Sequence, residues 1–300
     1  MSDRTIRRDA RAKINVFLRV LSTRADGYHD LESLVVPISL ADRVTVSRAD
    51  RLRIEVDGAP ALTGDVPAGG LNLALVAALA LGDACPHAGA ALVRIEKRIP
   101  PAAGLGGGSA DAAATLAALN ELWGCGLDPA TLADIGQRIG SDVPAMLADV
   151  PVLMYGRGEQ LAPAEVRPLW WVVCTFDFGV RSPDAYRWWD EDGGATGPDP
   201  EPLLDAAASG DAERLGPLLF NDLEASVTAR HPRIREAKEQ LLAAGALGSV
   251  MSGSGSSVVG LARDREHAEV LADRLDGAIV AQGPPVRIPR PAGPRALHEG

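Results

Sequence analysis

The 300-residue sequence has few cysteines and no long apolar run, and both scarcities exclude classes of protein. Its three cysteines, Cys85, Cys125 and Cys174, are odd in number, widely spaced and free of the CxxC or Cys/His spacing of a zinc site. We therefore expect neither a disulfide framework nor zinc, as in a reducing cytoplasm. No segment approaches the roughly 18 apolar residues that a membrane helix needs, and residues 1–11 are polar, so neither a membrane span nor an apolar targeting segment is predicted.

Positive charge is scarce as well. The sequence has 30 Lys and Arg residues against 40 Asp and Glu residues, a formal net charge of -10. Extended nucleic-acid binding draws on clustered basic side chains, so that class of partner is not expected, whereas a small phosphorylated ligand needs only local donors. With 46% hydrophobic and 23% charged residues, the chain is predicted to fold into one large or two ordinary globular domains.

The first 100 residues are predicted to be rich in strands, with one helix. Residues 12–20 alternate in the manner of a half-buried strand, so Lys13 and Asn15 share a face with Phe17 and Arg19. The opposite face is apolar and consists of Ala12, Ile14, Val16, Leu18 and Val20. Other strand patterns occur at 34–36, 44–46, 52–56 and 92–95, and a helical pattern occurs at 72–81.

The remainder of the chain predicts a helical region followed by a second α+β layer. Ser109 is expected to cap a helix that ends near Gly124, Asp128 and Pro129 start a second helix, and residues 141–144 start a third. Residues 190–202 are expected to form an exposed loop. The second layer comprises strands at 170–176, 248–251, 257–262 and 278–281 and helices at 203–243 and 266–275, with a peripheral tail over 284–300.

The most informative segment is Pro100–Ala114, in which four glycines lead into an alanine-rich helical pattern. Glycine permits positive φ and close backbone approach, and the first turn of a helix presents unpaired N–H groups to an anion. These features favour phosphate binding over the alternative of a flexible hinge. No Lys-Ser or Lys-Thr follows the glycines, so the segment is not a Walker A loop, and its glycine spacing does not fit the dinucleotide-binding fingerprint.

Four further patterns are ambiguous by themselves. Lys13 beside Asn15 is also typical of a solvated strand face, and Asp142 fits a first-turn acid favoured by the helix dipole. Residues 27–30, Gly-Tyr-His-Asp, offer rings that either stack on a base or pack in the core. Residues 252–257 form either a plain hairpin turn or a second loop of backbone amides that faces a ligand.

In chain order these motifs resemble the GHMP small-molecule kinases, and within them the family that phosphorylates 4-diphosphocytidyl-2-C-methyl-D-erythritol. The likeness spans most of residues 10–283 and rests on Ala12–Leu18, Gly27–Leu31, Pro100–Ala113, Gly140–Pro144 and Ser252–Gly255. It implies an α+β fold of two domains. The N-terminal one, over 1–162, would be a ribosomal-protein-S5-like ATP-binding domain with the glycine loop, and the C-terminal one, over 163–283, a ferredoxin-like α+β domain.

The resemblance also implies a reaction. The γ-phosphoryl group of ATP would pass to the 2-hydroxyl of 4-diphosphocytidyl-2-C-methyl-D-erythritol, in the non-mevalonate (MEP) pathway to isoprenoid precursors. By the family pattern Asp142 is the general base, Lys13 its electrostatic partner and Asn15 a ligand of the polyol. The alternatives are another GHMP kinase, for a sugar, homoserine or a mevalonate-type alcohol, and a nucleotide-binding module without catalysis.

The same resemblance implies the binding residues. Tyr28, His29 and Tyr186 would recognise the cytosine, and Asn72 and Lys97 would lie near the adenine of ATP. The ATP phosphates would contact the loop residues Pro100, Pro101, Ala102, Ala103, Gly104, Leu105, Gly106, Gly107, Gly108, Ser109 and Ala110, of which Ala102, Ala103 and Ala110 depart from the common family pattern. Mg²⁺ would arrive with the phosphates, with Asp111 as a candidate contributor rather than a protein metal site. The expected protein is cytoplasmic, a monomer or homodimer, without nucleic-acid or membrane partners.

Overall fold

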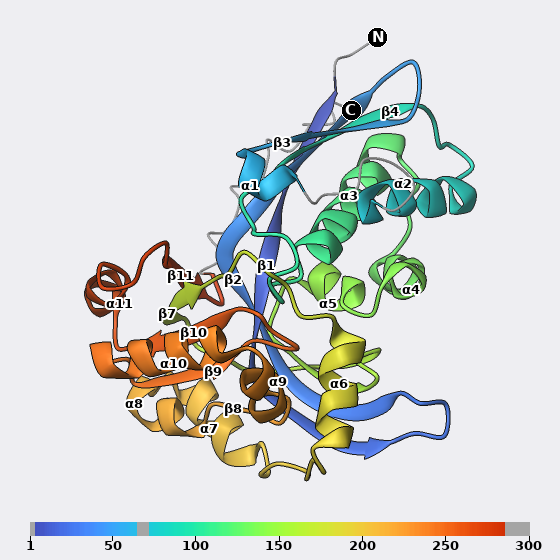
Figure 1. Ribbon diagram of the computed structural model, residues 1–300. Helices are drawn as coiled ribbons and strands as arrows, with labels where there is room; N and C mark the ends of the chain where they lie inside the picture. Colours follow the sequence, from blue (N-terminus) through green and yellow to red (C-terminus); the bar gives the residue numbers. More distant parts are fainter. Residues whose placement is uncertain (1–3, 65–71, 286–300) are drawn as a thin grey trace, which may run out of the picture.

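The computed structural model describes residues 4–64 and 72–285, which form two sheets flanked by helices (Figure 1). The seven-stranded sheet has the order β3-β4-β2-β1-β8, and β5 pairs with both β2 and β6. Its strands are β1 (Thr5–Thr23), β2 (His29–Arg48), β3 (Arg53–Asp57), β4 (Ala91–Glu96), β5 (Val152–Gly156), β6 (Gln160–Pro163) and β8 (Phe220–Asn221). The four-stranded sheet has the order β11-β7-β10-β9, with β7 (Leu169–Cys174), β9 (Gly248–Met251), β10 (Val258–Ala262) and β11 (Ile279–Gly283). This architecture confirms the predicted α+β class.

Two long antiparallel strands, β1 and β2, form the spine of the molecule. The patterns at 34–36 and 44–46 predict two strands, whereas both belong to the single 20-residue strand β2. Polar residues between the two apolar runs hide this continuity in the sequence. Strand β1 likewise extends beyond the predicted residues 12–20 at both ends.

The predicted alternation along β1 does not hold throughout, because its pairing with β2 shifts register at three points. One of these shifts lies between Asn15 and Phe17, as at a β-bulge. Phe17 therefore packs in the same buried cluster as Ile14, whereas Leu18 joins a different cluster. A bulge adds one residue to a strand, so the residues beyond it change faces and a strict period of two is lost.

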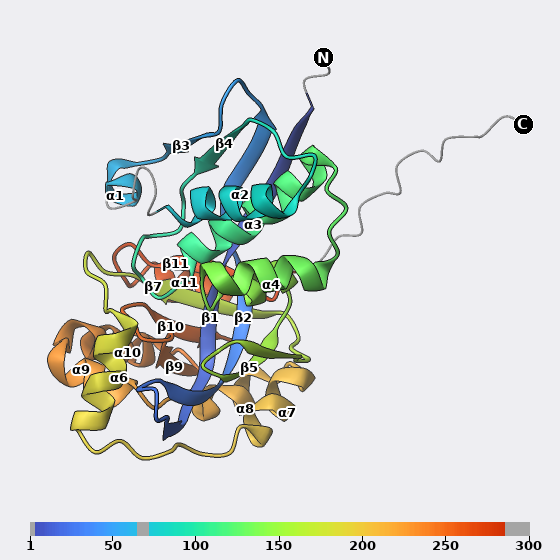
Figure 2. The same cartoon turned by 90° about the vertical axis from the view of Figure 1, so that its right-hand side faces the viewer.

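Four helices lie on one side of the β1–β2 pair, to the right of it in Figure 1, namely α2 (Leu73–Ala84), α3 (Gly107–Trp123), α4 (Pro129–Ile139) and α5 (Val143–Ala148). In Figure 2, α2, α3 and α4 lie in front of the strands. Buried residues such as Leu81 and Leu116 join these helices to the first sheet. The predicted cap Asp128 is confirmed, since its side chain accepts a hydrogen bond from the Thr131 amide. The predicted cap Ser109 is wrong, because α3 begins two residues earlier and Gly106 is its N-cap.

A disulfide joins Cys85 to Cys125, so the expectation of no disulfide is wrong. Cys85 ends α2 and Cys125 follows the end of α3. Because these two helices pack against each other, residues 40 positions apart become neighbours, which sequence spacing does not reveal. Cys174 is buried and unpaired, and burial raises its thiol pKa to about 11.

The second sheet and its helices occupy the other half of the chain. The helices after β7 are α6 (Ser182–Glu191), α7 (Glu201–Ser209), α8 (Ala212–Leu215), α9 (Glu224–Arg230), α10 (Pro232–Ala244) and α11 (Arg265–Ala272). Most follow the predicted order, but α6 is not among the predicted helices. It takes the first two residues of the predicted 190–202 loop, and α7 takes the last two. Short turns α1 (Pro60–Thr63) and η1 (Gly216–Leu218) complete the described elements.

Strand β8 belongs to the C-terminal half in sequence yet pairs in parallel with β1 of the first sheet. The predicted boundary at 162/163 stays a prediction, and so does the place of the tail, since residues 286–300 lie outside the described residues. Within residues 4–64 and 72–285, no helix combines the length and the apolar character that a membrane crossing requires.

Candidate active site

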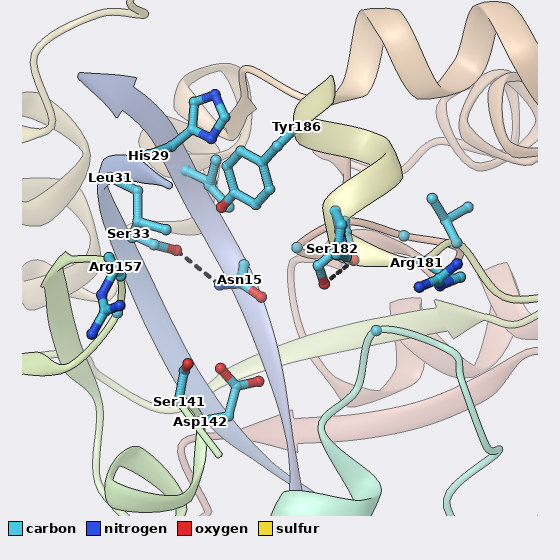
Figure 3. Close-up of a pocket in the computed structure, with 18 of the residues that line it drawn as sticks. Asn15, His29, Leu31, Ser33, Ser141, Asp142, Arg157, Arg181, Ser182 and Tyr186 are labelled. Carbon is cyan, nitrogen blue, oxygen red and sulfur yellow. Dashed lines mark hydrogen bonds between the residues drawn. The ribbon is translucent and has the colours of Figure 1, made fainter. Parts of the chain in front are cut away.

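A cavity of about 1210 Å³ opens beside the middle of β1 (Figure 3). Its walls come from β1, β2, the glycine loop, the start of α5, helix α6 and the loop 252–257. The structure thus brings together motifs from both halves of the chain. The residues proposed from sequence that line it are Lys13, Asn15, Tyr28, His29, Ala102, Gly104, Gly106, Asp142 and Tyr186.

Lys13 lies at the centre of a small polar network. Its side chain is 9% exposed, so the solvated-lysine interpretation is wrong. Its Nζ donates a 2.6 Å hydrogen bond to Asn15 Oδ1 and lies 3.7 Å from Asp142 Oδ2. Asn15 Nδ2 donates to Ser33 Oγ at 2.8 Å, the dashed contact on β1 and β2 in Figure 3. The ammonium group is therefore held between an amide oxygen and a carboxylate.

Asp142 is the N-cap residue of α5, but its side chain makes no capping hydrogen bond. The carboxylate points toward the cavity instead, with 36% of the side chain exposed (Figure 3). Burial raises the pKa of Tyr186, and the Asp142 carboxylate raises it further. Asp142 thus acts electrostatically on both Lys13 and Tyr186 across the cavity.

The glycine loop contacts β1 directly beside Lys13. The Lys13 amide donates to Leu105 O at 3.0 Å, which places the loop against the strand. Gly106 has φ +71°, and a Cβ there would lie 2.5 Å from Met146 Cε and 3.2 Å from Lys13 Cγ. The positive φ favours glycine at this position, which starts the first turn of α3, with its unpaired amides, beside Lys13.

The segment 252–257 combines the two alternatives raised by its sequence. It is a hairpin connection, because the Ser252 amide donates to Ser257 O at 2.9 Å. It also faces the cavity with Gly253, Ser254 and Gly255, and Ser252 Oγ accepts a hydrogen bond from the Asn15 amide at 3.1 Å.

Aromatic and imidazole rings form the other end of the cavity. The rings of His29 and Tyr186 stack with centroids 4.8 Å apart. Tyr28 is 57% exposed, and the Arg157 guanidinium lies 4.9 Å from its ring centroid. His29 Nε2 is 3.0 Å from both carboxylate oxygens of Asp190. This end combines flat ring faces with polar side chains, a combination that suits a heterocyclic base.

Two residues proposed for the adenine do not line the cavity. Asn72 caps α2, where its Oδ1 accepts from the Ala74 amide at 3.0 Å. Lys97 is buried in ion pairs with Asp42 and with Asp111, the latter at 2.8 Å. Among the residues that the structure describes, Asp111 Oδ1 has no hydrogen-bond partner, and burial raises the Asp111 pKa to about 7 against the opposing effect of Lys97.

Several loop residues also lie away from the cavity wall. Ala103 and Leu105 are buried in the core, at 2% and 1% exposure. The wall residues given by the structure likewise do not include Pro100, Pro101, Gly107, Gly108, Ser109 and Ala110. The backbone amides of Gly107, Gly108 and Ser109, in the first turn of α3, nevertheless follow directly after the wall residue Gly106.

Sequence reasoning missed Ser33, Arg157, Arg181, Ser182 and Asp190, which also line the cavity. Arg157 lies in the β5–β6 turn and Ser33 near the start of β2, where nothing local signals a ligand. For Ser182 a signal existed, since a serine followed by proline is typical of a helix start.

Comparison with known proteins defines the class. Residues 72–157 match the model of the GHMP kinases N-terminal domain and residues 203–280 that of the GHMP kinases C-terminal domain. Homoserine kinase from Cytophaga hutchinsonii shares the fold at 18% identity and a TM-score of 0.64, covering 90% of this chain and 94% of its own. The fold is that of a GHMP kinase, and the chain belongs to this class of ATP-dependent small-molecule kinases.

Relatives with higher sequence identity identify the family within the GHMP kinases. The 4-diphosphocytidyl-2-C-methyl-D-erythritol kinases of Symbiobacterium thermophilum and Moorella thermoacetica are each 44% identical, covering 89% of this chain and 94% and 93% of the relatives. A crystal structure of 4-(cytidine 5'-diphospho)-2C-methyl-D-erythritol kinase is 36% identical with a TM-score of 0.80, covering 93% of this chain and 99% of that one. The chain belongs to the 4-diphosphocytidyl-2-C-methyl-D-erythritol kinase family.

Proposed function

We propose that this protein transfers the γ-phosphoryl group of ATP to the 2-hydroxyl of 4-diphosphocytidyl-2-C-methyl-D-erythritol. The observation that carries the proposal is the Lys13–Asp142 pair, with 3.7 Å between Nζ and Oδ2. It lies between the glycine loop on one side and the ring-lined end of the cavity on the other. A phosphoryl donor and a base-bearing acceptor can therefore meet at one carboxylate.

Asp142 is the proposed general base. Its carboxylate, which makes no capping hydrogen bond, accepts the proton of the acceptor hydroxyl as the hydroxyl oxygen attacks the γ-phosphorus. The bond between the γ-phosphorus and the β-phosphate oxygen breaks, and ADP is released. Lys13 stabilises the charge that develops on the attacking and transferred oxygens. Asn15, fixed by Lys13 and Ser33, is placed to bind the polyol.

The glycine loop is the proposed site of the ATP phosphates. Gly106 opens α3, and the amides and dipole of its first turn suit an anion. Within the described residues no three carboxylate, histidine or cysteine side chains form a metal-binding group. An Mg²⁺ ion that arrives with ATP would be held chiefly by phosphate oxygens and water, where it would neutralise phosphate charge. The adenine contacts of Asn72 and Lys97 stay predictions.

The ring-lined end is the proposed cytidine site. Tyr28 and Tyr186 offer faces for the base and His29 offers its edge, while Arg157 beside Tyr28 supplies positive charge near the diphosphate. We further assign the enzyme to the cytoplasm, where ATP is available, as a monomer or homodimer. No nucleic-acid partner is proposed for a chain of net charge -10.

An assay of purified protein with ATP and Mg²⁺ tests the proposal. 4-Diphosphocytidyl-2-C-methyl-D-erythritol should release ADP, and phosphorus NMR should locate the new phosphate on O2. Homoserine, mevalonate and a free sugar serve as competing acceptors in parallel reactions. Faster turnover of any of these would favour another GHMP kinase activity, and no turnover of any acceptor by folded protein would favour a binding module.

A further inference from the structure

Three residues on one face of α6 hold the His29 ring. Tyr186 stacks on it at 4.8 Å, Trp189 meets it edge-on at 5.9 Å, and Asp190 binds its Nε2 at 3.0 Å. The spacing i, i+3 and i+4 places all three side chains on the same helical face. The His29 side chain is only 7% exposed, so α6 determines how the first residue of β2 is presented.

Asp190 is fixed in turn by β1. Thr23 Oγ1 donates a 3.1 Å hydrogen bond to Asp190 Oδ1, the same oxygen that contacts His29. Asp190 therefore links α6 to the ends of both strands of the spine. It also lines the cavity, although nothing in the proposed phosphoryl transfer uses it.

The contact between Asp190 and His29 determines which ring nitrogen of His29 carries hydrogen. A carboxylate can only accept, so the hydrogen lies on Nε2, which faces both Asp190 oxygens. Nδ1 has no hydrogen-bond partner among the residues that the structure describes. In the neutral ring, Nδ1 is then an acceptor available to a ligand.

We propose that Asp190 is a positioning residue that holds His29 as the Nε2–H tautomer, so that Nδ1 accepts a hydrogen bond from the exocyclic amino group of the substrate's base. This inference rests on the proposed function, because it requires the base to bind at the ring-lined end. Uracil carries a carbonyl oxygen where cytosine carries its amino group and has its only N–H at the neighbouring ring position. A fixed acceptor therefore selects a 4-aminopyrimidine.

Steady-state kinetics of Asp190→Ala, Asp190→Asn and wild type test the role. Asp190→Ala should raise KM for the cytidine substrate about tenfold, the effect of one lost charge-assisted hydrogen bond, and leave KM for ATP unchanged. Asp190→Asn keeps an acceptor oxygen and should restore most of the affinity. Glu191→Gln, which removes a neighbouring acid on α6 that pairs with Arg187, is the matched control and should leave both KM values unchanged.

Two further readouts separate positioning from a general structural role. The preference for the cytidine substrate over its uridine analogue should fall in Asp190→Ala, whereas equal losses for both substrates would overturn the selection of the amino group. Imidazole ¹⁵N chemical shifts of wild-type His29 should report hydrogen on Nε2, and hydrogen on Nδ1 would overturn the tautomer assignment even if Asp190→Ala failed to fold. Wild type that does not turn over the cytidine substrate refutes the proposed function, whereas active wild type with unchanged kinetics in Asp190→Ala refutes only this inference.

Discussion

Gly104 and Gly255 approach so closely that a Cβ on Gly104 would lie 2.7 Å from the carbonyl oxygen of Gly255. The first belongs to the glycine loop before α3, and the second to the hairpin between β9 and β10. A hydrogen bond from the Ser257 amide to Ala103 O, at 3.1 Å, fixes the same contact. The proposed phosphate loop is thus supported by a segment about 150 positions away in sequence.

Substitution of Gly104 should test this contact. Gly104 has φ +74°, so Gly104→Ala combines an unfavourable backbone conformation with a clash against backbone atoms. We expect a loss of about 1–3 kcal/mol in unfolding free energy and a raised KM for ATP. The control is Gly126→Ala, where φ is +69° but no atom lies within 4 Å, so stability should fall by less and KM should not change. Equal effects of the two substitutions in urea titration and kinetics would contradict the role of the contact.

Asp142→Ala should lower kcat by roughly 10²–10⁴-fold, because the proton acceptor is removed while the amides of the glycine loop stay. ATP affinity, measured by calorimetry, should be nearly unchanged. If ATP affinity and kcat fall together, Asp142 has a structural role at the start of α5 instead.

Asn221 should matter for both stability and activity. Its buried Nδ2 donates to Met251 O and Gly253 O, both at 2.7 Å, on either side of Ser252. Asn221→Ala leaves these carbonyls unpaired and should cost about 1–3 kcal/mol. Loss of order in the 252–257 loop should also reduce kcat/KM.

A control exists in Asn120 near the end of α3, which also makes two hydrogen bonds to the backbone. Its Nδ2 donates to Leu127 O at 2.9 Å, and its Oδ1 accepts from the Leu127 amide at 3.1 Å. Asn120→Ala should cost comparable stability and leave kcat/KM unchanged. An identical kinetic loss in both variants would show that general destabilisation, rather than the loop, reduces activity.

Reduction of the Cys85–Cys125 disulfide should lower stability more than activity. The bond closes a loop of 40 residues, which in the chain-entropy model corresponds to about 4 kcal/mol. It lies at the end of α3 opposite the glycine loop, so kcat should be retained at low temperature. Thermal unfolding with and without dithiothreitol, compared with Cys85→Ser/Cys125→Ser, measures the effect. A Tm that does not respond to the reductant in wild type would contradict the prediction.

The buried Asp111 predicts a pH dependence of stability. Its pKa is raised from 3.8 to about 7, chiefly by burial. The folded state then binds more protons than the unfolded state between these values, so this group makes stability decline as pH rises from about 4 to 7. Asp111→Asn should flatten that slope in urea unfolding at pH 5, 6 and 7. A slope in Asp111→Asn equal to that of wild type would show that other groups cause it.

The sequence was most informative where chemistry is local. The glycine loop, the Asp128 cap and the strand patterns around residues 248–262 depend on neighbouring residues, and the structure contains them. The family resemblance identified Lys13 and Asp142 as candidate catalytic residues. Strand alternation and helix capping alone would describe Lys13 as an ordinary strand residue and Asp142 as an ordinary acid at a helix start.

Features created by tertiary contacts escaped prediction. The bulge after Asn15 depends on pairing with β2, and the disulfide depends on how α2 packs on α3. Arg157 lines the cavity only because the β5–β6 turn folds over Tyr28 and brings the guanidinium against the Tyr28 ring. Ser109 fits the usual chemistry of an N-cap, yet the positive φ of Gly106 starts α3 earlier.

Strand β8 also has a consequence for how the chain can be divided. Phe220 and Asn221 pair with Phe17 and Leu18, so the strand that carries Lys13 is completed by residues from the other half. A fragment that ended before β7 would leave this edge of β1 unpaired, and an exposed apolar edge invites pairing with other chains. The two halves are therefore poor candidates for independent expression or for exchange between related enzymes, and recombination should succeed only when β1 and β8 come from the same parent.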